Sequence, residues 1–390
     1  MVTQPSKRLN RKIDYSFSFE RVRSYKVIFS RTQENFSICF NRTVSDKDKR
    51  MGTIRDVAAH AGVSISTVSL ALTGTDRVSK ETRAKVIAAA QAVDYVPNTL
   101  APSLRNGATR HIGLITGDLT NPFTGTMLHA IERHATAANY TIVVMNSDRN
   151  PDRELVALNL LKSQRVAGIL LNSMGCDPDH IRKVERISMP IVLIDQRISQ
   201  KLDFVGVDNE LSSRMLTEYL VRLGHRRIAF IGGQPGLWTA DMRLKGFLDT
   251  LEQHGIPHDP SLCLAGDYRG DSAYQITVDL LSHGTPPTAI LAANNVMALG
   301  ALEAILALGF RCPLDISLAG IDDVPWGTLV KPRLTMVTQP IEDLANTATN
   351  WLLEQVANVG APHTPQCLVL PPRLVLGESC ADIRDRPTSD

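Results

Sequence analysis

The feature of the sequence that most constrains the fold is an alternation that begins near Arg110. Short apolar runs, such as residues 166–173, alternate with longer stretches whose apolar residues recur at helical spacing, such as residues 152–164. Near-continuous apolar runs are typical of parallel strands that are buried on both faces of a sheet. Because the set of runs repeats from about residue 204, the pattern predicts two doubly wound α/β lobes in tandem.

The elements expected in this region are of two kinds. Strands are predicted at residues 111–119, 141–149, 166–173, 190–197, 204–209, 226–234, 262–267, 288–295 and 316–323. Helices are predicted at residues 125–140, 152–164, 210–224, 240–255, 272–284 and 296–309. The C-terminal segments are expected to complete the crossovers and the second lobe, at residues 334–340, 341–359 (a helix) and 367–379.

A different pattern precedes the lobes, between Thr53 and Gly74. Thr53 can cap a first helix, with Asp56 three residues later, and Gly62 can end it. Ser64 can cap a second helix, from Ile65 to Leu72. Val68, Ala71 and Leu72 would pack back on the first helix. The side chains left pointing outward are those of Ile65, Ser66, Thr67, Ser69 and Leu70. This is the pattern of a DNA-reading helix-turn-helix, although an ordinary helical hairpin remains an alternative.

A third helix is predicted from Ser79, which is a natural N-cap with Thr82 at the third helical position. Its apolar stripe is expected to consist of Val86, Ile87, Ala90 and Val93. This helix would complete a small all-α domain.

Composition limits the remaining possibilities. The 390 residues are 43% hydrophobic and 21% charged, as in a soluble globular protein. No apolar run approaches the roughly 20 residues that span a bilayer. The six cysteines are scattered and contain no CxxC pair, which indicates free thiols in a reducing cytoplasm and no structural zinc. They are Cys39, Cys176, Cys263, Cys312, Cys367 and Cys380.

Charge is distributed unevenly along the chain. Residues 1–50 contain 12 Lys and Arg against 5 Asp and Glu, whereas the chain from residue 111 onward contains 23 against 31. A basic front on an acidic body suggests a polyanionic partner for the front alone. For residues 1–50 three interpretations compete: a disordered basic arm, a targeting peptide, and an upstream extension with translation starting at Met51, which we favour.

Three stretches carry a family resemblance: DVAAHAGVSISTVSLALTG, RVSKETRAKVIAAAQAVDYVPN and LAPSLRNG. They resemble the lactose-repressor (LacI/GalR) family of bacterial transcription regulators, and the resemblance extends over residues 51–380. It implies a small all-α helix-turn-helix domain followed by a two-lobed α/β effector domain with the periplasmic-binding-protein fold. The implied domains are a DNA-binding domain (51–97), a hinge (98–109), an effector-binding and dimerisation domain (110–380) and a polar tail (381–390).

The resemblance implies roles for particular residues in DNA binding. Ile65, Ser66 and Leu70 occupy the family's base-reading positions, where apolar side chains contact thymine methyl groups. An alternative for Leu70 is simple packing. Phosphate contacts would come from Thr67, Ser69 and Arg77. Leu104 would wedge into the minor groove from a hinge helix, which Pro102 is expected to keep short.

The resemblance also implies a ligand site between the lobes. Arg243 is the most informative member, although a surface salt bridge is its alternative role. Asn295 stands where relatives commonly carry Asp. Aromatic faces combined with Arg, Asp and Asn suit a small polar ring compound, and favour a sugar or sugar derivative over a purine. The implied ligand-binding residues are Phe123, Asp195, Trp238, Thr239, Arg243, Tyr268, Asn294, Asp322 and Gln339.

Catalytic motifs give no competing function. GxGxxG, GxxxxGK[ST], GxSxG and HExxH are all absent, so no enzyme, cofactor or metal is expected. Asp322 and Asp323 could suggest metal or acid–base chemistry, but hydrogen bonding to a ligand explains Asp322 better. Four histidines near predicted helix ends or loops are expected on the surface: His225, His254, His258 and His283.

The sequence therefore predicts a cytoplasmic, dimeric transcription regulator that acts as a repressor. It would bind a pseudo-palindromic operator in double-stranded DNA, with an affinity set by a small polar effector that acts as inducer or corepressor. No membrane partner is expected. The alternative is a periplasmic-type small-molecule receptor without DNA function, against which the front domain argues.

Overall fold

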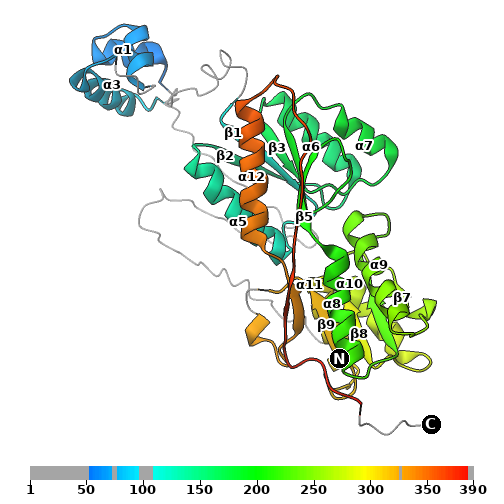
Figure 1. Ribbon diagram of the computed structural model, residues 1–390. Coiled ribbons are helices and arrows are strands. Elements are labelled where there is room, and N and C mark those ends of the chain that lie inside the picture. The colour runs from blue at the N-terminus through cyan, green and yellow to red at the C-terminus, as the bar shows by residue number, and fades with distance from the viewer. Residues whose placement is uncertain (1–51, 73–76, 96–108, 325–326, 385–390) are drawn as a thin grey trace, which may run out of the picture. The chain divides into compact units, whose positions relative to one another are not determined.

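The computed structural model describes residues 52–72, 77–95, 109–324 and 327–384 (Figure 1). The chain divides into two units, Met1–Asn98 and Thr99–Asp390, and each is described by itself. Residues 1–50, the hinge with Pro102 and Leu104, and the end of the polar tail lie outside the described residues.

The first unit is a bundle of three short helices, α1 (Ile54–Ala61), α2 (Ile65–Leu72) and α3 (Lys80–Ala92). Thr53 and Asp56 form a reciprocal capping box, and Gly62 ends α1 in the left-handed conformation at φ 67°. Ser79 caps α3 by accepting from the Thr82 amide. These three caps are as predicted.

The apolar face of α3 differs from the prediction at one position. Ile87 is 44% exposed, whereas Ala89 is buried beside Val86 and Ala90. The stripe that faces α1 and α2 therefore runs through Val86, Ala89, Ala90 and Val93, which is the i, i+3, i+4, i+7 spacing of a helix face. Ile87 lies one residue outside this stripe.

The second unit consists of two lobes, each built on a six-stranded sheet. The N-lobe sheet has the order β11-β5-β4-β3-β1-β2, and all its neighbours are parallel. Its strands are β1 (His111–Thr116), β2 (Thr141–Asn146), β3 (Gly168–Leu171), β4 (Ile191–Ile194), β5 (Asp203–Val207) and β11 (Cys367–Leu370). Its helices are α5 (Pro122–Ala137), α6 (Pro151–Ser163), α7 (Pro178–Glu185) and α12 (Ile341–Ala357).

The C-lobe sheet has the order β12-β10-β9-β8-β6-β7, with β12 antiparallel at its edge. Its strands are β6 (Ile228–Ile231), β7 (Cys263–Leu264), β8 (Ala289–Ala292), β9 (Ser317–Ile321), β10 (Thr335–Thr338) and β12 (Arg373–Val375). Its helices are α8 (Asn209–Arg222), α9 (Trp238–Gln253), α10 (Gly270–Ser282) and α11 (Asn295–Ala307), with 3-10 turns η1 (Pro260–Leu262) and η2 (Gly327–Leu329).

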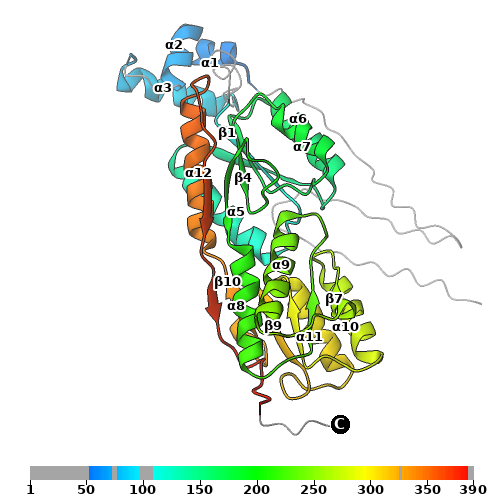
Figure 2. The same cartoon turned by 45° about the vertical axis from the view of Figure 1, so that its right-hand side comes forward.

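The chain passes between the lobes three times, after β5, between β10 and α12, and between β11 and β12. Figures 1 and 2 show α12, near the C-terminus, lying alongside α5 of the N-lobe, and buried residues of both helices belong to one core cluster. The expectation that the second lobe begins at residue 204 and contains α12 and β11 was therefore wrong, whereas β10 and β12 lie in the C-lobe as expected. Strand β5 pairs with β4, and β11 pairs with β5, so both complete the first sheet.

Smaller differences have local causes. Helix α5 begins three residues earlier than predicted because Asn121 caps it and Pro122 fits its first turn. Helix α7 was not anticipated. His225 is fully buried, not on the surface, because its ring nitrogens lie 2.9 Å from Thr288 Oγ1 and 3.2 Å from the Ala381 carbonyl. No helix in the described part of the chain has the length and apolar character needed to cross a membrane.

Helices α8 and α9 pack at very close range at Gly246. A Cβ atom at this position would lie 2.2 Å from the Glu210 carbonyl oxygen. We expect Gly246→Ala to lower the free energy of unfolding by about 1–3 kcal/mol, because the backbone of α8 would have to move. Thermal unfolding of the full chain measures the effect.

Gly125 supplies a matched control, since it also lies in a helix and a Cβ atom there would meet nothing within 4 Å. Gly125→Ala should raise the free energy of unfolding by about 0.5–1 kcal/mol. Equal effects of the two substitutions would contradict the close-packing argument.

Candidate functional site

Five of the predicted DNA-binding residues lie on α2: Ile65, Ser66, Thr67, Ser69 and Leu70. Ser64 caps this helix by accepting from the Thr67 amide at 3.1 Å, and its hydroxyl lies 2.8 Å from both Ser66 Oγ and Thr67 Oγ1. Ile65 is 45% exposed, and Ser66 is exposed as well. The start of α2 therefore presents one apolar side chain beside a group of linked hydroxyls.

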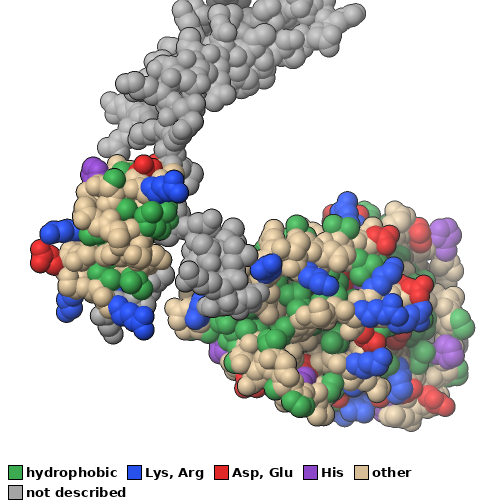
Figure 3. Space-filling view, turned by 90° about the horizontal axis from the view of Figure 1, so that it is seen from above, with side chains coloured by type: hydrophobic (Ala, Val, Ile, Leu, Met, Phe, Trp, Pro, Cys, Tyr) green, Lys and Arg blue, Asp and Glu red, His purple; other side chains and the backbone are tan. Residues whose placement is uncertain are grey.

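The other members of the predicted set are less uniform. Ser69 and Arg77 are exposed, whereas Thr67 and Leu70 are partly buried. Leu104 lies outside the described residues. Figure 3 shows Lys and Arg side chains spread around the visible face of this unit, with acidic side chains among them. The roles of these residues in DNA binding stay predictions.

The second candidate site is a cavity of about 70 Å³ between the two lobes. It lies where parallel strands end, since Thr116, Asn172 and Asp195 follow or end strands of the N-lobe and Asn294 and Asp322 follow strands of the C-lobe. Its lining residues are Thr116, Gly117, Asp118, Asn121, Phe123, Thr124, Arg149, Asn172, Met174, Asp195, Gln196, Thr239, Arg243, Tyr268, Asn294 and Asp322.

Arg243, on α9, is the central cation of this cavity and is only 3% exposed. Its Nε donates to Asn209 Oδ1 at 2.6 Å, and its Nη1 donates to the Ala293 carbonyl. Nη1 also lies 3.8 Å from Asp322 Oδ2. The alternative of a surface salt bridge is therefore excluded by the burial of the guanidinium group.

Asp195 and Asp322 occupy equivalent places in the two lobes. Each follows the third strand of its sheet order, and each amide donates to the next strand along, to Val205 and Val337 respectively. Burial raises the pKa of Asp195 to about 6, with Arg243 opposing and Asp322 adding to the shift. Burial also raises the pKa of Asp322, against the opposing effects of Arg243 and a hydrogen bond from Gln339. The cavity thus places one cation between carboxylates of opposite lobes.

The backbone around the cavity is strained. Four non-glycine lining residues have positive φ: Arg149 at 56°, Asp195 at 67°, Tyr268 at 64° and Asp322 at 68°. Such residues cost about 1–3 kcal/mol each and persist where the surrounding structure imposes them. Strain of this kind is concentrated at functional sites, which supports the cavity as the binding site.

Side-chain hydrogen bonds connect the lobes at the cavity wall. They are those from Gln196 Nε2 to Thr239 Oγ1 (2.7 Å), from Arg149 Nη2 to the Tyr268 carbonyl (3.0 Å) and from Asn295 Nδ2 to Asn121 Oδ1 (3.2 Å). Arg149 is itself paired with Asp118 at 2.6 Å. Relative movement of the lobes would have to break these bonds.

The structure places most of the predicted ligand-binding residues at this cavity. Trp238 does not line it, because its ring packs edge-on against Phe204 with centroids 5.2 Å apart. Gln339 does not line the cavity either, but its side chain donates to Asp322, which does. The predicted residues that do line the cavity are Phe123, Asp195, Thr239, Arg243, Tyr268, Asn294 and Asp322. Their contact with a ligand stays a prediction.

Several lining residues were missed by the sequence analysis. Thr116 and Asn172 stand at strand ends, so the reasoning that selected Asp195 could have found them. Gln196 directly follows Asp195 and could have been included for the same reason. Arg149 does not stand at a strand end in the structure, so this reasoning does not select it. Two consecutive residues with positive φ, Asp148 and Arg149, turn the chain toward the cavity here.

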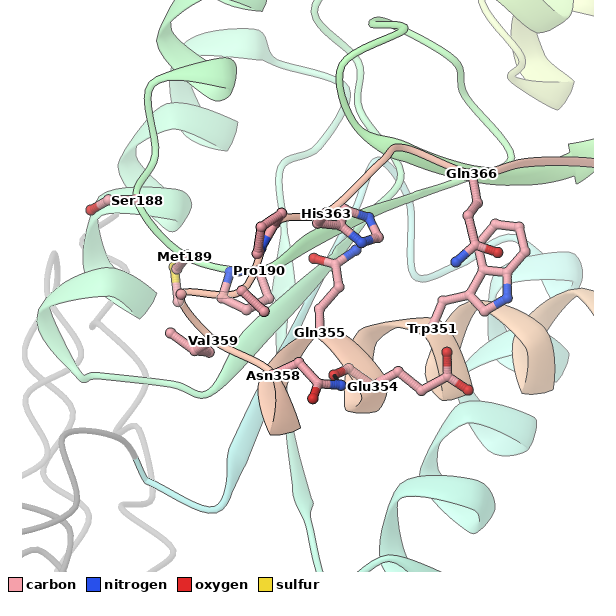
Figure 4. A pocket seen from close by; sticks show the side chains of 13 residues that line it. Ser188, Met189, Pro190, Trp351, Glu354, Gln355, Asn358, Val359, His363 and Gln366 are labelled. Carbon is pink, nitrogen blue, oxygen red and sulfur yellow. Dashed lines mark hydrogen bonds between the residues drawn. The ribbon is translucent and has the colours of Figure 1, made fainter.

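A larger cavity of about 490 Å³ lies wholly within the N-lobe (Figure 4). It is bounded by residues 188–190, the end of α12 and the loop 358–366, and Figure 4 shows His363 and Gln355 close together within it. Both donate to the buried carboxylate of Asp203, at 2.8 and 2.7 Å. This cavity is at the amino ends of β4 and β5, whereas ligands of such sheets bind at the carboxyl ends, so the interlobe cavity is the better candidate.

Comparisons with known proteins agree with this geometry. Residues 53–98 match bacterial regulatory proteins of the lacI family, and residues 217–380 match a periplasmic binding protein-like domain. The chain is 32% identical over 329 residues to the ribose operon repressor of Halalkalibacterium halodurans, covering 84% of this chain and 97% of the relative. It is 34% identical over 336 residues to the HTH-type transcriptional repressor PurR of Yersinia pestis, covering 85% and 98%. A crystal structure of the lac repressor dimer bound to operator and the anti-inducer ONPF matches with a TM-score of 0.75 and 30% identity, covering 85% and 100%.

The raised pKa of Asp195 predicts a pH dependence of stability. Because the folded state binds this proton more tightly than the unfolded state, the free energy of unfolding should fall between about pH 4 and pH 6 and then level off. Asp195→Asn removes this contribution, so its thermal midpoint at pH 7 should rise by about 2–4 °C. Thermal scans from pH 4 to pH 8 measure both effects.

Glu252→Gln, on the exposed surface of α9, is the control and should leave the slope between pH 5 and pH 6 unchanged. A destabilised Asp195→Asn variant with the pH profile of the natural protein would contradict the assigned cost of burying this carboxylate.

Proposed function

Because the chain belongs to the LacI family of bacterial regulatory proteins, and is therefore a DNA-binding transcriptional regulator, we propose that it is an effector-controlled repressor. It acts in the cytoplasm as a homodimer on a pseudo-palindromic operator, and it has no enzymatic activity. Residues 51–97 bind DNA, residues 98–109 form the hinge, and residues 110–380 bind the effector and dimerise. The named relatives are repressors, which supports repression over activation of transcription.

The observation that carries the proposal is the buried Arg243 between acidic groups of two separate lobes. A ligand that bonds to Arg243 and Asp322 of the C-lobe and to Asp195 of the N-lobe interacts with both lobes at once. Its binding free energy then depends on the angle between the lobes. Such a ligand shifts the population toward the arrangement that it binds more tightly.

The volume of the cavity supports coupling between binding and lobe movement. Ligand pockets usually measure about 300–1,000 Å³, whereas about 70 Å³ accommodates only two or three waters. A sugar-sized effector therefore has to separate the lobes or displace side chains. The bonds that it would break are those that connect the lobes, such as Gln196 to Thr239.

The DNA-binding helices are joined to the effector domain just before its first strand, β1. Thr109 is anchored by backbone and side-chain hydrogen bonds to the Arg165 carbonyl immediately before β1. Because residues 96–108 join the DNA-binding helices to this point, movement of the N-lobe alters the spacing of two hinges in a dimer. In the proposal Leu104 wedges between bases, and an altered spacing removes it from the groove.

Base reading is assigned to α2. Ile65 and Leu70 contact thymine methyl groups, and Ser66 bonds to a base edge. Thr67, Ser69 and Arg77 hold phosphates and fix the register. The exposure of Ile65 beside the capping hydroxyl of Ser64 supports this arrangement.

A gel-shift experiment on DNA from upstream of the protein's own gene tests the proposal. We expect specific retardation at moderate salt, altered by a sugar from a panel of candidates. A failure to retard this DNA even at low salt, with and without the candidate sugars, would refute the regulator function and leave a small-molecule receptor.

Two isoleucines of the DNA-binding unit provide a matched test of base reading. Ile65→Ala should weaken operator binding by about 1–2 kcal/mol, roughly tenfold, because an apolar contact with the operator is lost. Ile87 is equally exposed, but on α3, and Ile87→Ala should change the affinity by about twofold or less. Comparable losses in the two variants would contradict the assignment of α2 as the reading helix.

A further inference from the structure

The charged groups of the interlobe cavity favour an uncharged ligand over an anionic one, because carboxylates outnumber cations in its wall. Three carboxylates and two guanidinium groups line it within the described chain: Asp118, Asp195, Asp322, Arg149 and Arg243. Arg149 is paired with Asp118 at 2.6 Å, and Arg243 already bonds to Asn209, to the Ala293 carbonyl and faces Asp322. A phosphate or carboxylate entering this cavity would add charge to a site that is already rich in carboxylates.

The helix N-termini at the cavity wall are also occupied. Exposed amides at a helix N-terminus are the usual anion site of such folds. Here Asn121 accepts from the Phe123 amide at the start of α5, at 2.9 Å. Asn294 accepts from the Met297 amide at the start of α11, at 2.9 Å, and Gln196 Oε1 accepts from the Thr239 amide of α9, at 3.3 Å. Side-chain oxygens thus fill the places that a phosphate would take.

Three polar atoms of the cavity wall have no partner in the described structure; two of them only accept, and the third is a hydroxyl that can accept or donate. Thr116 Oγ1, Asn172 Oδ1 and Asp195 Oδ1 are buried, line the cavity and have no hydrogen-bond partner in the described structure. The orientation of the Asn172 amide is fixed, because its Nδ2 points to Asp195 Oδ2 at 3.5 Å and a carboxylate only accepts. Buried acceptors without donors are costly, so the ligand that fits here brings hydrogen-bond donors.

We propose that the effector is an uncharged polyhydroxy compound, a free sugar or polyol, and that the cavity rejects phosphorylated and carboxylated sugars. Neighbouring hydroxyls of the ligand donate to Thr116, Asn172 and Asp195 of the N-lobe, while Arg243 donates to a ring or hydroxyl oxygen. Asp118 and Asp322 already face Arg149 and Arg243, and an ammonium group would lie beside the buried Arg243 cation, so amines are disfavoured as well. This inference rests on the proposed function and narrows its effector.

Thermal-shift measurements on the full chain with matched pairs test the inference. Free pentoses, hexoses, disaccharides and hexitols are compared with the corresponding sugar phosphates, aldonic acids and amino sugars at equal concentrations. We expect at least one free sugar or polyol to raise the thermal midpoint, since a ligand of the folded state stabilises it by mass action. Its phosphate and its acid should bind at least about a hundredfold more weakly.

A pair of threonine variants locates the effect. Thr116→Val removes the unpartnered hydroxyl at the end of β1 and should weaken binding of the free sugar about tenfold. Thr141→Val alters an exposed threonine of the neighbouring strand and should leave it unchanged. The thermal midpoint measured without sugar reports whether each variant is folded. If Thr116→Val is not folded, the comparison of free sugars with their phosphates and acids on the natural protein still tests the inference.

Stabilisation only by phosphorylated, acidic or amino compounds, or by none of the free sugars and polyols, overturns the inference. Retardation of the upstream DNA by the same preparation would then show that the regulator function survives. If the protein binds a free sugar but does not retard the upstream DNA, the proposed function is refuted. The assignment of the ligand class then still holds.

Discussion

The buried guanidinium group of Arg243 is the interaction on which the rest of the molecule depends. A cation in the interior persists only when acidic and polar groups surround it, and here those groups come from both lobes. Asp322 and Asn209 hold it from the C-lobe side, while Asp195 faces it from the N-lobe. The relative position of the lobes is therefore tied to the electrostatic balance of one small cavity.

The fold places these groups by repeating one device in each lobe. A parallel strand ends in an aspartate held at positive φ, whose amide continues the sheet and whose carboxylate turns into the cavity. The strain at Asp195 and Asp322 is supported by the fully buried strands that they follow, β4 and β9. The chain crosses between the lobes three times, so a change of the angle between them would bend the chain at these three crossings.

Local chemistry made part of this structure predictable. Thr53, Gly62 and Ser79 determine helix ends through their own backbone and hydroxyl groups, so the DNA-binding helices could be read from the sequence. The lobe membership of β5 and α12 could not be read from the sequence, because it depends on contacts between residues more than 100 positions apart, such as Gln355 with Asp203. Arg149 was missed because a strained loop places it, and the burial of His225 was missed because its partner, Thr288, is distant in the sequence.

Reciprocal linkage tests the central claim, that the interlobe cavity governs DNA binding, most directly. Operator affinity is measured with and without a saturating amount of the stabilising sugar, and sugar affinity with and without saturating operator. The account predicts that both affinities change by the same factor, about fivefold or more. Affinities that are each unaffected by the other ligand would show that the cavity and the DNA-binding helices act independently, which would contradict it.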